Sequence, residues 1–440
     1  MASAGVQDEG APYRAAKATA RALMTRAQKI ENEEARRAAI KYALRCEDKR
    51  ALEAMVSLAR HDLVVAVTHE GLDIDPWLLN VNNGTIDLRS GALRPHRRKD
   101  LITKIAPVAY EPGAQCERFE RFVSEIMGGN PALVMFLHRF LGYALTGDVR
   151  EHILPLWWGS GCNGKSLLAL VLVSVMGDYV CKAAPDLLLK SEHTDRHPTE
   201  LCDLHGRRLV IFNETTRGRS WDEGTVKDIT GGDRIRARRM REDFWEFNPT
   251  HKLVVFGNHK PRIRCVDDAM RRRLRLVPFA VSFEGRQDKG LASTLLAESS
   301  GILRWLLDGC AAWLRDGIPL PPAVSDATSQ YFRDEDTLGL FFEAECVFEP
   351  SAKIARKSIR DRYCAWIEES SEHPVSAKAF AEALRQPGCT ERQVRTDTGS
   401  SRGWLGVRLA TDAERAQRGH VDTCGHQFQV QRECLLGANT

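Results

Sequence analysis

An eight-residue stretch, 159–166, carries the clearest chemical signal in this sequence. It reads Gly159-Ser160-Gly161-Cys162-Asn163-Gly164-Lys165-Ser166 and fits the pattern G-x-x-x-x-G-K-[ST], the phosphate-binding loop of nucleotide hydrolases. Glycines allow backbone N–H groups to curl around phosphate oxygens, and the N-terminus of a following helix adds a favourable dipole. In such a loop Lys165 would reach the β- and γ-phosphates of ATP, and the Ser166 hydroxyl would hold Mg²⁺.

The segments around this loop have the character that a phosphate-binding loop requires. The apolar run 153–158 precedes it and predicts a buried strand, and the stretch 167–176, which contains no Gly or Pro, predicts a helix. Two further apolar runs, 209–212 and 253–256, are each followed by polar residues. Because parallel strands deliver polar groups to their carboxyl edge, we expect an α/β fold with a site at that edge.

The polar residues after these two runs include a candidate acid and a candidate sensor of the γ-phosphate. Hydrolysis needs a carboxylate that polarises the attacking water or holds Mg²⁺, and Glu214 lies about fifty residues beyond the loop, at the end of a predicted strand. A surface glutamate in a turn is an equally good interpretation of Glu214 taken alone. If the acid lies elsewhere, Asp203 or Asp233 is the next candidate. The amide of Asn258 can orient the attacking water.

Positive charge is concentrated in one part of the chain. The formal net charge of all 440 residues is only +4, yet residues 231–275 contain thirteen Lys and Arg against six Asp and Glu. Such a concentration beside a nucleotide site indicates nucleic acid as a partner. It includes Arg271-Arg272-Arg273, and an arginine supplied by a neighbouring subunit can neutralise transition-state charge. Three adjacent arginines are also typical of a solvated basic turn.

A second set of arginines in the basic segment alternates along the chain. Arg234, Arg236 and Arg238 would face one way on a strand, and their guanidinium groups could bind successive phosphates without reading sequence. A solvated strand face is the alternative. A register slip of one residue would present Arg239 or Arg241 instead.

Eight motifs, in order, resemble those of the phage and plasmid primase–helicase family, whose C-terminal part is a superfamily-3 helicase with poxvirus-type NTPase relatives. The resemblance covers about residues 70–345. The motifs are Asp75 to Asn80 with Asn83 to Leu88, Phe140 to Tyr143, Gly159 to Ser166, Leu204 to Leu209, Glu214-Thr215, Thr230 to Asp233, Phe256 to Pro261, and Arg272 to Leu276.

The resemblance implies a P-loop, AAA+-like core that hydrolyses ATP with Mg²⁺. It places the family's catalytic residues on Lys165, Glu214, Asn258 and either Arg272 or Arg273, and the phosphate-loop serine on Ser166. Glu214 would also hold Mg²⁺ together with Ser166. Many superfamily members carry two adjacent acids where this chain has Asn213-Glu214, so the division between Mg²⁺ ligand and base stays open.

The resemblance also implies a ring, hexameric by analogy, that encloses single-stranded or forked DNA. A basic hairpin that projects into the channel would fall at about 227–241, with Lys227, Arg234, Arg236, Arg238 and Arg239 as its DNA contacts. The predicted function is therefore an ATP-dependent replicative DNA helicase. A nucleotide-switched initiator or loader that does not unwind processively shares every motif and is the alternative.

Four regions are expected along the chain. Residues 1–60 form a helical lead-in, 61–145 an α+β linking domain, 146–335 the ATPase domain and 336–440 a winged-helix-like module of two short helices with a Gly-rich turn. The runs 64–67 and 101–105 look like strands of the linking domain, and Asn82-Asn83-Gly84 and Ser90-Gly91 are turn signals. The first region is too short for a polymerase-type domain. We therefore expect no primer synthesis, and a separate primase or polymerase as a possible partner.

Composition is that of an ordinary globular protein. Hydrophobic residues make up 43% and charged residues 28% of the chain. No apolar run has the length of a membrane span, the N-terminus lacks the layout of a signal peptide, and no C-x-x-C pair occurs among twelve cysteines. These features predict a cytoplasmic protein without a membrane partner, and the family suggests a phage, prophage or plasmid as its source.

Overall fold

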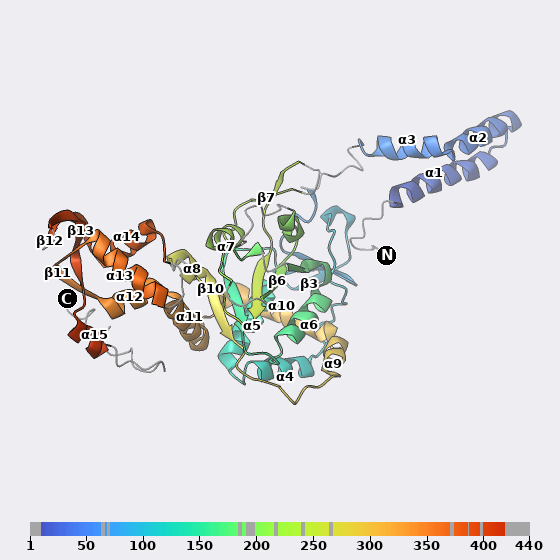
Figure 1. Cartoon of the computed structure of the whole chain (residues 1–440). Coiled ribbons are helices and arrows are strands. Elements are labelled where there is room, and N and C mark those ends of the chain that lie inside the picture. The colour runs from blue at the N-terminus through green and yellow to red at the C-terminus, as the bar shows by residue number, and fades with distance from the viewer. Residues whose placement is uncertain are drawn as a thin grey trace.

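The computed structural model describes residues 10–62, 67, 71–183, 187–190, 199–214, 219–238, 243–263, 267–369, 374–385, 387–396 and 399–418. Three parts follow one another along the chain (Figure 1). They are a group of N-terminal helices, a central body around a five-stranded parallel sheet, and a C-terminal unit with its own three-stranded antiparallel sheet. The mixed α/β class predicted from the sequence is confirmed.

The N-terminal part consists of α1 (Ala11–Gln28), α2 (Glu33–Cys46) and α3 (Lys49–Ala59), as the helical pattern predicts. The Asn32 side chain caps α2 by accepting a hydrogen bond from the Ala35 N–H at 3.0 Å. The helices share only a small core, around Leu52 and Val56, and stand away from the central body in Figure 1.

A small antiparallel sheet follows, formed by β1 (Leu78–Val81), β2 (Gly84–Asp87) and β3 (Ala92–Arg94). Its two turns coincide with the predicted turn signals. The predicted strand at 101–105 is wrong: this segment has no strand, and only Ala106 forms a single bridge, to Val81. The N–H groups of Thr103 and Ile105 instead donate to carboxylates, those of Asp73 and Asp178. Residues 64–66 of the other predicted strand lie outside the described residues.

Three helices form one side of the central body: α4 (Glu117–Ile126), α5 (Pro131–Tyr143) and α10 (Ser299–Asp316). The structure explains why residue 142 of the motif is a glycine, because a Cβ at this position would overlap the backbone of Gly309 and Cys310. Glycine thus allows α5 and α10 to cross closely, and the apolar stripe of α10 belongs to the core.

The parallel sheet has the order β10-β4-β9-β6-β5. Its strands are β4 (Leu154–Trp158), β5 (Val180–Ala183), β6 (Leu209–Glu214), β9 (Lys252–Gly257) and β10 (Leu274–Pro278). Alternate residues serve two cores, so that Leu156 packs on one face of the sheet and Trp157 on the other. Both faces are therefore covered, which explains the continuous apolar runs in the sequence.

Helices α6 (Lys165–Met176), α9 (Leu291–Ala297), α7 (Glu223–Thr230), α8 (Asp268–Arg273) and α11 (Pro322–Glu335) complete the central body. The first two join α4, α5 and α10 in one core, whereas α7 and α8 pack in the core on the opposite face, and α11 contributes to both. Short 3-10 turns precede β5 (η3, Gly177–Tyr179) and β6 (η5, Glu200–Leu204).

The C-terminal unit contains α12 (Thr337–Glu345), β11 (Cys346–Ala355), α13 (Arg356–Glu369), α14 (Ala377–Arg385), β12 (Thr390–Thr396), β13 (Gly399–Leu409) and α15 (Asp412–Arg418). The two predicted short helices are confirmed as α13 and α14. The chain reverses close to the predicted Gly-rich turn, where Thr396 of β12 pairs with Gly399 of β13, and Gly403 itself lies within β13. A Cβ there would overlap the side chain of Val394 and the carbonyl of Ile354, so glycine serves close strand packing.

Candidate functional site

The glycine loop lies between β4 and α6, the arrangement that its sequence requires. Gly161 and Gly164 have φ angles of +112° and +85°, in the region that glycine adopts without strain, and Cys162 is also left-handed at +47°. Helix α6 begins at Lys165. The loop therefore turns the chain sharply at the carboxyl end of β4 and presents a helix N-terminus beyond it.

A cavity of about 640 Å³ opens beside this loop. This volume is typical of sites that hold a small molecule of nucleotide size. Its lining combines the glycine loop, the ends of two strands, helix α4 and the segment before α9: Arg118, Phe122, Glu125, Gly161 to Leu167, Asn213, Phe256 to His259, Phe283, Arg286 to Asp288, and Leu291.

Lys165 is almost fully buried at the base of this cavity. Its Nζ donates to the carbonyl of Gly159 and to Oδ1 of Asn163, both at 2.9 Å, and to Oδ1 of Asn258 at 3.4 Å. These partners are uncharged, and burial lowers the pKa of Lys165 from 10.5 to about 8. An anionic phosphate would be a stronger partner for this ammonium than any of the three amide or carbonyl oxygens.

The two strands with polar ends meet at this edge of the sheet. β9 lies directly between β4 and β6, which brings Asn258 to the lysine, and Asn213 lines the same cavity. Glu214 is the last residue of β6 and is in register with Gly257; its side chain lies outside the described residues. Asp203 and Asp233, the alternative candidates for the acid, do not line the cavity.

Helix α4 and the segment before α9 form a wall of the cavity that the motifs do not predict. Arg118 and Glu125 of α4 form an ion pair at 3.3 Å, and Phe122 lies so close to the loop that a Cβ at Gly164 would contact its ring. The N–H of Phe283 donates to the Cys162 carbonyl at 2.7 Å, which ties the second segment to the loop. The amphipathic pattern of α4 predicts only its burial.

The three adjacent arginines lie in α8, outside this cavity. β10 starts at Leu274 opposite Leu154, whereas the glycine loop follows Trp158 at the other end of the same strand pair. Five residues of strand span about 17 Å. Arg273 is held within its own chain, since its Nε donates to Thr230 Oγ1 at 2.9 Å. Arg272 is exposed and has no polar side-chain partner among the described residues.

A two-stranded hairpin, β7 (Ile235–Ala237) and β8 (Trp245–Phe247), lies within the basic segment. Its position differs from the predicted one at 227–241: Lys227 belongs to α7 and pairs with Asp267. The reason is local, because Asp222 caps a helix that runs to residue 230. The return strand comes later than expected, and Arg239 and Arg241 lie outside the described residues.

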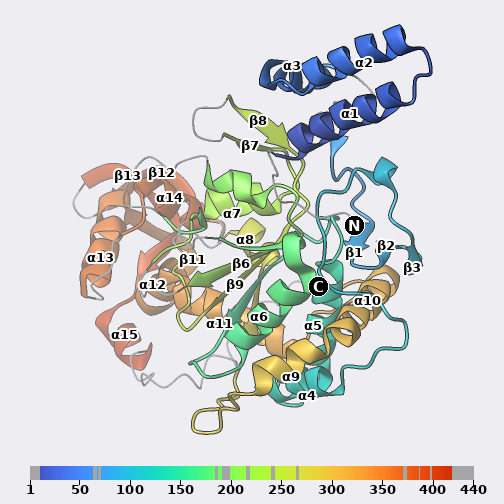
Figure 2. The same ribbon diagram turned by 90° about the vertical axis from the view of Figure 1, so that its right-hand side faces the viewer.

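The hairpin has one buried and one exposed face. Ile235, Ala237 and Phe247 are buried, and His205 packs edge-on against Trp245 and Phe247. Arg234 and Arg236 are exposed. Figures 1 and 2 show the hairpin at the opposite end of the central body from α4 and α9, which flank the cavity.

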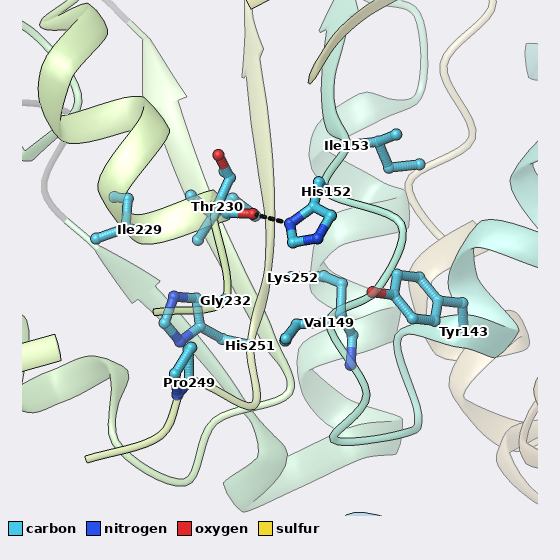
Figure 3. Close-up of a pocket in the computed structure, with 11 residues that line it drawn as sticks. Tyr143, Val149, His152, Ile153, Ile229, Thr230, Gly232, Pro249, His251 and Lys252 are labelled. Atoms are coloured by element: carbon cyan, nitrogen blue, oxygen red, sulfur yellow. Dashed lines mark hydrogen bonds between the residues drawn. The ribbon is translucent and has the colours of Figure 1, made fainter. Parts of the chain in front are cut away.

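A second, much smaller cavity of about 10 Å³ lies near the start of β9 (Figure 3). It has room for about one water molecule. His251 is buried beside it, and burial together with the adjacent Lys252 ammonium lowers the pKa of His251 to about 4. His152 contacts the Thr230 carbonyl at 2.8 Å. This cavity is too small for a substrate.

Within the described part of the chain, no helix has the length and apolar character needed to cross a membrane. Two family models match the sequence. One, described as "D5 N terminal like", covers residues 4–128, and the other, a "Family of unknown function", covers residues 157–273. The second match contains the glycine loop, both polar strand ends and the arginines of α8.

Similar proteins come from large DNA viruses. The "Putative helicase L207/L206" of Acanthamoeba polyphaga mimivirus is 27% identical over 283 residues, 59% of this chain and 29% of the relative. The "Putative primase C962R" of African swine fever virus (isolate Tick/Malawi/Lil 20-1/1983) is 24% identical over 310 residues, 64% and 32% respectively. The "Putative helicase 022R" of Frog virus 3 (isolate Goorha) is 23% identical over 361 residues, 75% and 34%.

The chain thus spans about a third of the length of these curated relatives. Among solved structures, the apo C-terminal region of NrS-1 is similar with a TM-score of 0.43 and 10% identity, over 70% of this chain and 79% of that one. The family matches and the viral relatives support the same primase–helicase family that the sequence motifs resemble.

Proposed function

We propose that this chain is an ATP-dependent DNA helicase of the superfamily-3, AAA+-like type, which assembles into a ring around single-stranded or forked DNA. The observation that carries the proposal is the convergence of Lys165 and Asn258 in one cavity at the carboxyl edge of a parallel sheet. A phosphate loop alone would indicate nucleotide binding. A sensor amide from a neighbouring strand adds a group that can act on the attacking water.

ATP with Mg²⁺ fits the groups present. The phosphates would lie against the glycine loop and the N-terminus of α6, where Lys165 would balance the charge of the β- and γ-phosphates. The Ser166 hydroxyl would hold Mg²⁺ together with Glu214, which ends a strand at the same edge. Bound Mg²⁺ would neutralise charge that develops on the transferred phosphoryl group. Asn258 would orient the water.

The arginine that completes the site would come from the next subunit. None of the α8 arginines lines the cavity of its own chain, so an α8 arginine could act as a finger only in the cavity of another chain. Arg272 suits that role better than Arg273, because Arg273 is held by Thr230 whereas Arg272 is exposed. The proposed ring therefore rests on a composite site, in which one chain supplies the loop and another supplies Arg272.

The hairpin would bind the DNA backbone. Arg236 and Arg238 lie on one face, and their guanidinium groups would hold successive phosphates regardless of sequence. Replacing Arg234, Arg236 and Arg238 by Ala should weaken binding of an oligonucleotide. Each lost contact should also flatten the salt dependence by about 0.7 log unit per log unit of salt. An unchanged slope would place the DNA contacts elsewhere.

Hydrolysis is tested by two variants of the cavity. Lys165→Ala should abolish ATPase activity because the cation that balances the phosphates is lost. Glu214→Gln should still bind ATP but fail to turn it over, since the change removes a charge and keeps the shape. Turnover at the wild-type rate in Glu214→Gln would show that another residue is the acid.

Unwinding is tested by strand displacement on a forked duplex with ATP, with Lys165→Ala as the control. Displacement that needs ATP supports the helicase. ATP hydrolysis and DNA binding without displacement would instead identify a nucleotide-switched initiator or loader.

A further inference from the structure

The exposed face of the hairpin carries one aromatic side chain among its arginines. Phe244 directly precedes β8 and is 45% exposed. The guanidinium carbons of Arg236 and Arg238 lie 4.3 and 4.7 Å from the centre of its ring. Two arginines therefore lie over one exposed aromatic ring.

The strand register explains this grouping. Ala237 pairs with Trp245 and Arg236 with Glu246, so continuing the ladder by one residue sets Arg238 opposite Phe244. Side chains opposite each other on antiparallel strands share a face, as do diagonal neighbours such as Arg236. The other face of the hairpin is anchored by Ile235, Ala237 and Phe247 in the core. The backbone thus holds Phe244 outward, and this position does not serve the core.

We infer that Phe244 stacks on an unpaired base of single-stranded DNA while the two arginines hold the adjoining phosphates. This inference rests on the proposed role of the hairpin in DNA binding. A cation on an exposed ring is held weakly, whereas a guanidinium group on a phosphate forms charge-assisted hydrogen bonds. A strand that recruits Arg236 and Arg238 therefore uncovers the ring, and every base offers a face to it.

The occupant follows from this chemistry. A paired base in a duplex has both faces covered by its neighbours, so an aromatic ring can stack only on an unpaired one. Stacking accepts any base, which agrees with arginines that contact only phosphates. The hairpin would thereby distinguish single strands from duplexes without reading sequence, a property that the arginines alone would not supply.

The test compares two labelled strands of equal length and charge, an oligothymidylate and a fully abasic oligonucleotide, by fluorescence anisotropy. Phe244→Ala should weaken oligothymidylate binding by roughly ten- to a hundredfold, the usual effect of losing one stacked base. It should change binding of the abasic strand by less than about threefold, and Phe244→Trp should retain wild-type affinity for both. Tyr42→Ala, which removes another exposed aromatic ring, is the matched control and should have no effect.

Two results would overturn the inference. An equal loss on both strands in Phe244→Ala would mean that the ring only supports the arginines, and an unchanged affinity for oligothymidylate would mean that it takes no part. An Arg236→Ala/Arg238→Ala variant distinguishes failure of the base-stacking inference from failure of the proposed DNA-binding role of the hairpin. If this double variant binds both strands normally, the hairpin is not the DNA-binding surface and both ideas fail. If the double variant binds weakly but Phe244→Ala binds like wild type, only the stacking inference fails and the proposed role of the arginines stands. Thermal melting of each variant checks that it is folded.

Discussion

Nucleotide affinity should fall at alkaline pH because of the buried lysine in the glycine loop. Burial lowers the pKa of Lys165 to about 8. A bound phosphate favours the charged ammonium and raises this pKa. Below pH 8 the lysine is already charged, so affinity should hardly depend on pH. Above pH 8 binding must take up a proton, and affinity should decrease.

The size of the effect follows from this linkage. For a group with a pKa of about 8 in the free protein and a higher one in the complex, affinity should fall about fivefold from pH 8 to pH 9 and about tenfold from pH 9 to pH 10. ADP in buffer with a chelator is the suitable ligand, because its phosphates are already ionised in this range and no metal ion contributes. Calorimetry in two buffers of different ionisation enthalpy should also show uptake of about one proton at pH 9.

Lys165→Arg is the control, since a guanidinium group stays charged throughout this range. Its affinity for ADP should be lower but independent of pH. A flat affinity profile for the wild-type protein up to pH 9.5, or the same slope in Lys165→Arg, would refute the assignment of the titration to this lysine.

Two further predictions concern packing and assembly. Gly142→Ala should destabilise the central body by about 1–3 kcal/mol, because the added methyl group overlaps the backbone of α10. Thermal melting should show this loss of stability. Gly113→Ala is the control and should melt at the wild-type temperature, because a Cβ at that position meets open space. Arg272→Ala should abolish ATPase activity with no change in melting temperature, whereas Arg273→Ala should lower that temperature because its bond within the chain is lost. Mixing Arg272→Ala with Lys165→Ala should restore some ATPase activity if the site is composite, and a monomer that hydrolyses ATP at full speed in the presence of DNA would contradict the composite site.

Much of the central sheet could be predicted from the sequence. The strands β4, β6 and β9 are short apolar runs with polar residues at their ends, and both features depend only on neighbours along the chain. Helix α6 likewise follows from an uninterrupted apolar stretch after the glycine loop. The prediction failed at 101–105, where the residues have an apolar pattern typical of a strand. There, backbone N–H groups that a strand would pair with a neighbouring strand donate instead to side-chain carboxylates from distant parts of the chain.

The candidate site, like the fold, could be predicted only in part from the sequence. From the sequence alone, the glycine loop, Glu214 and Asn258 could be predicted as candidate site residues, because residue type and spacing indicate their chemistry. The tertiary structure was needed to show that β9 lies between β4 and β6, which brings Asn258 to Lys165, and that residues of α4 line the cavity. It also decided that Arg273 is held within its chain whereas Arg272 is exposed. Such facts depend on strand order and on contacts between residues far apart in the chain, which packing of the whole core selects and no local pattern encodes.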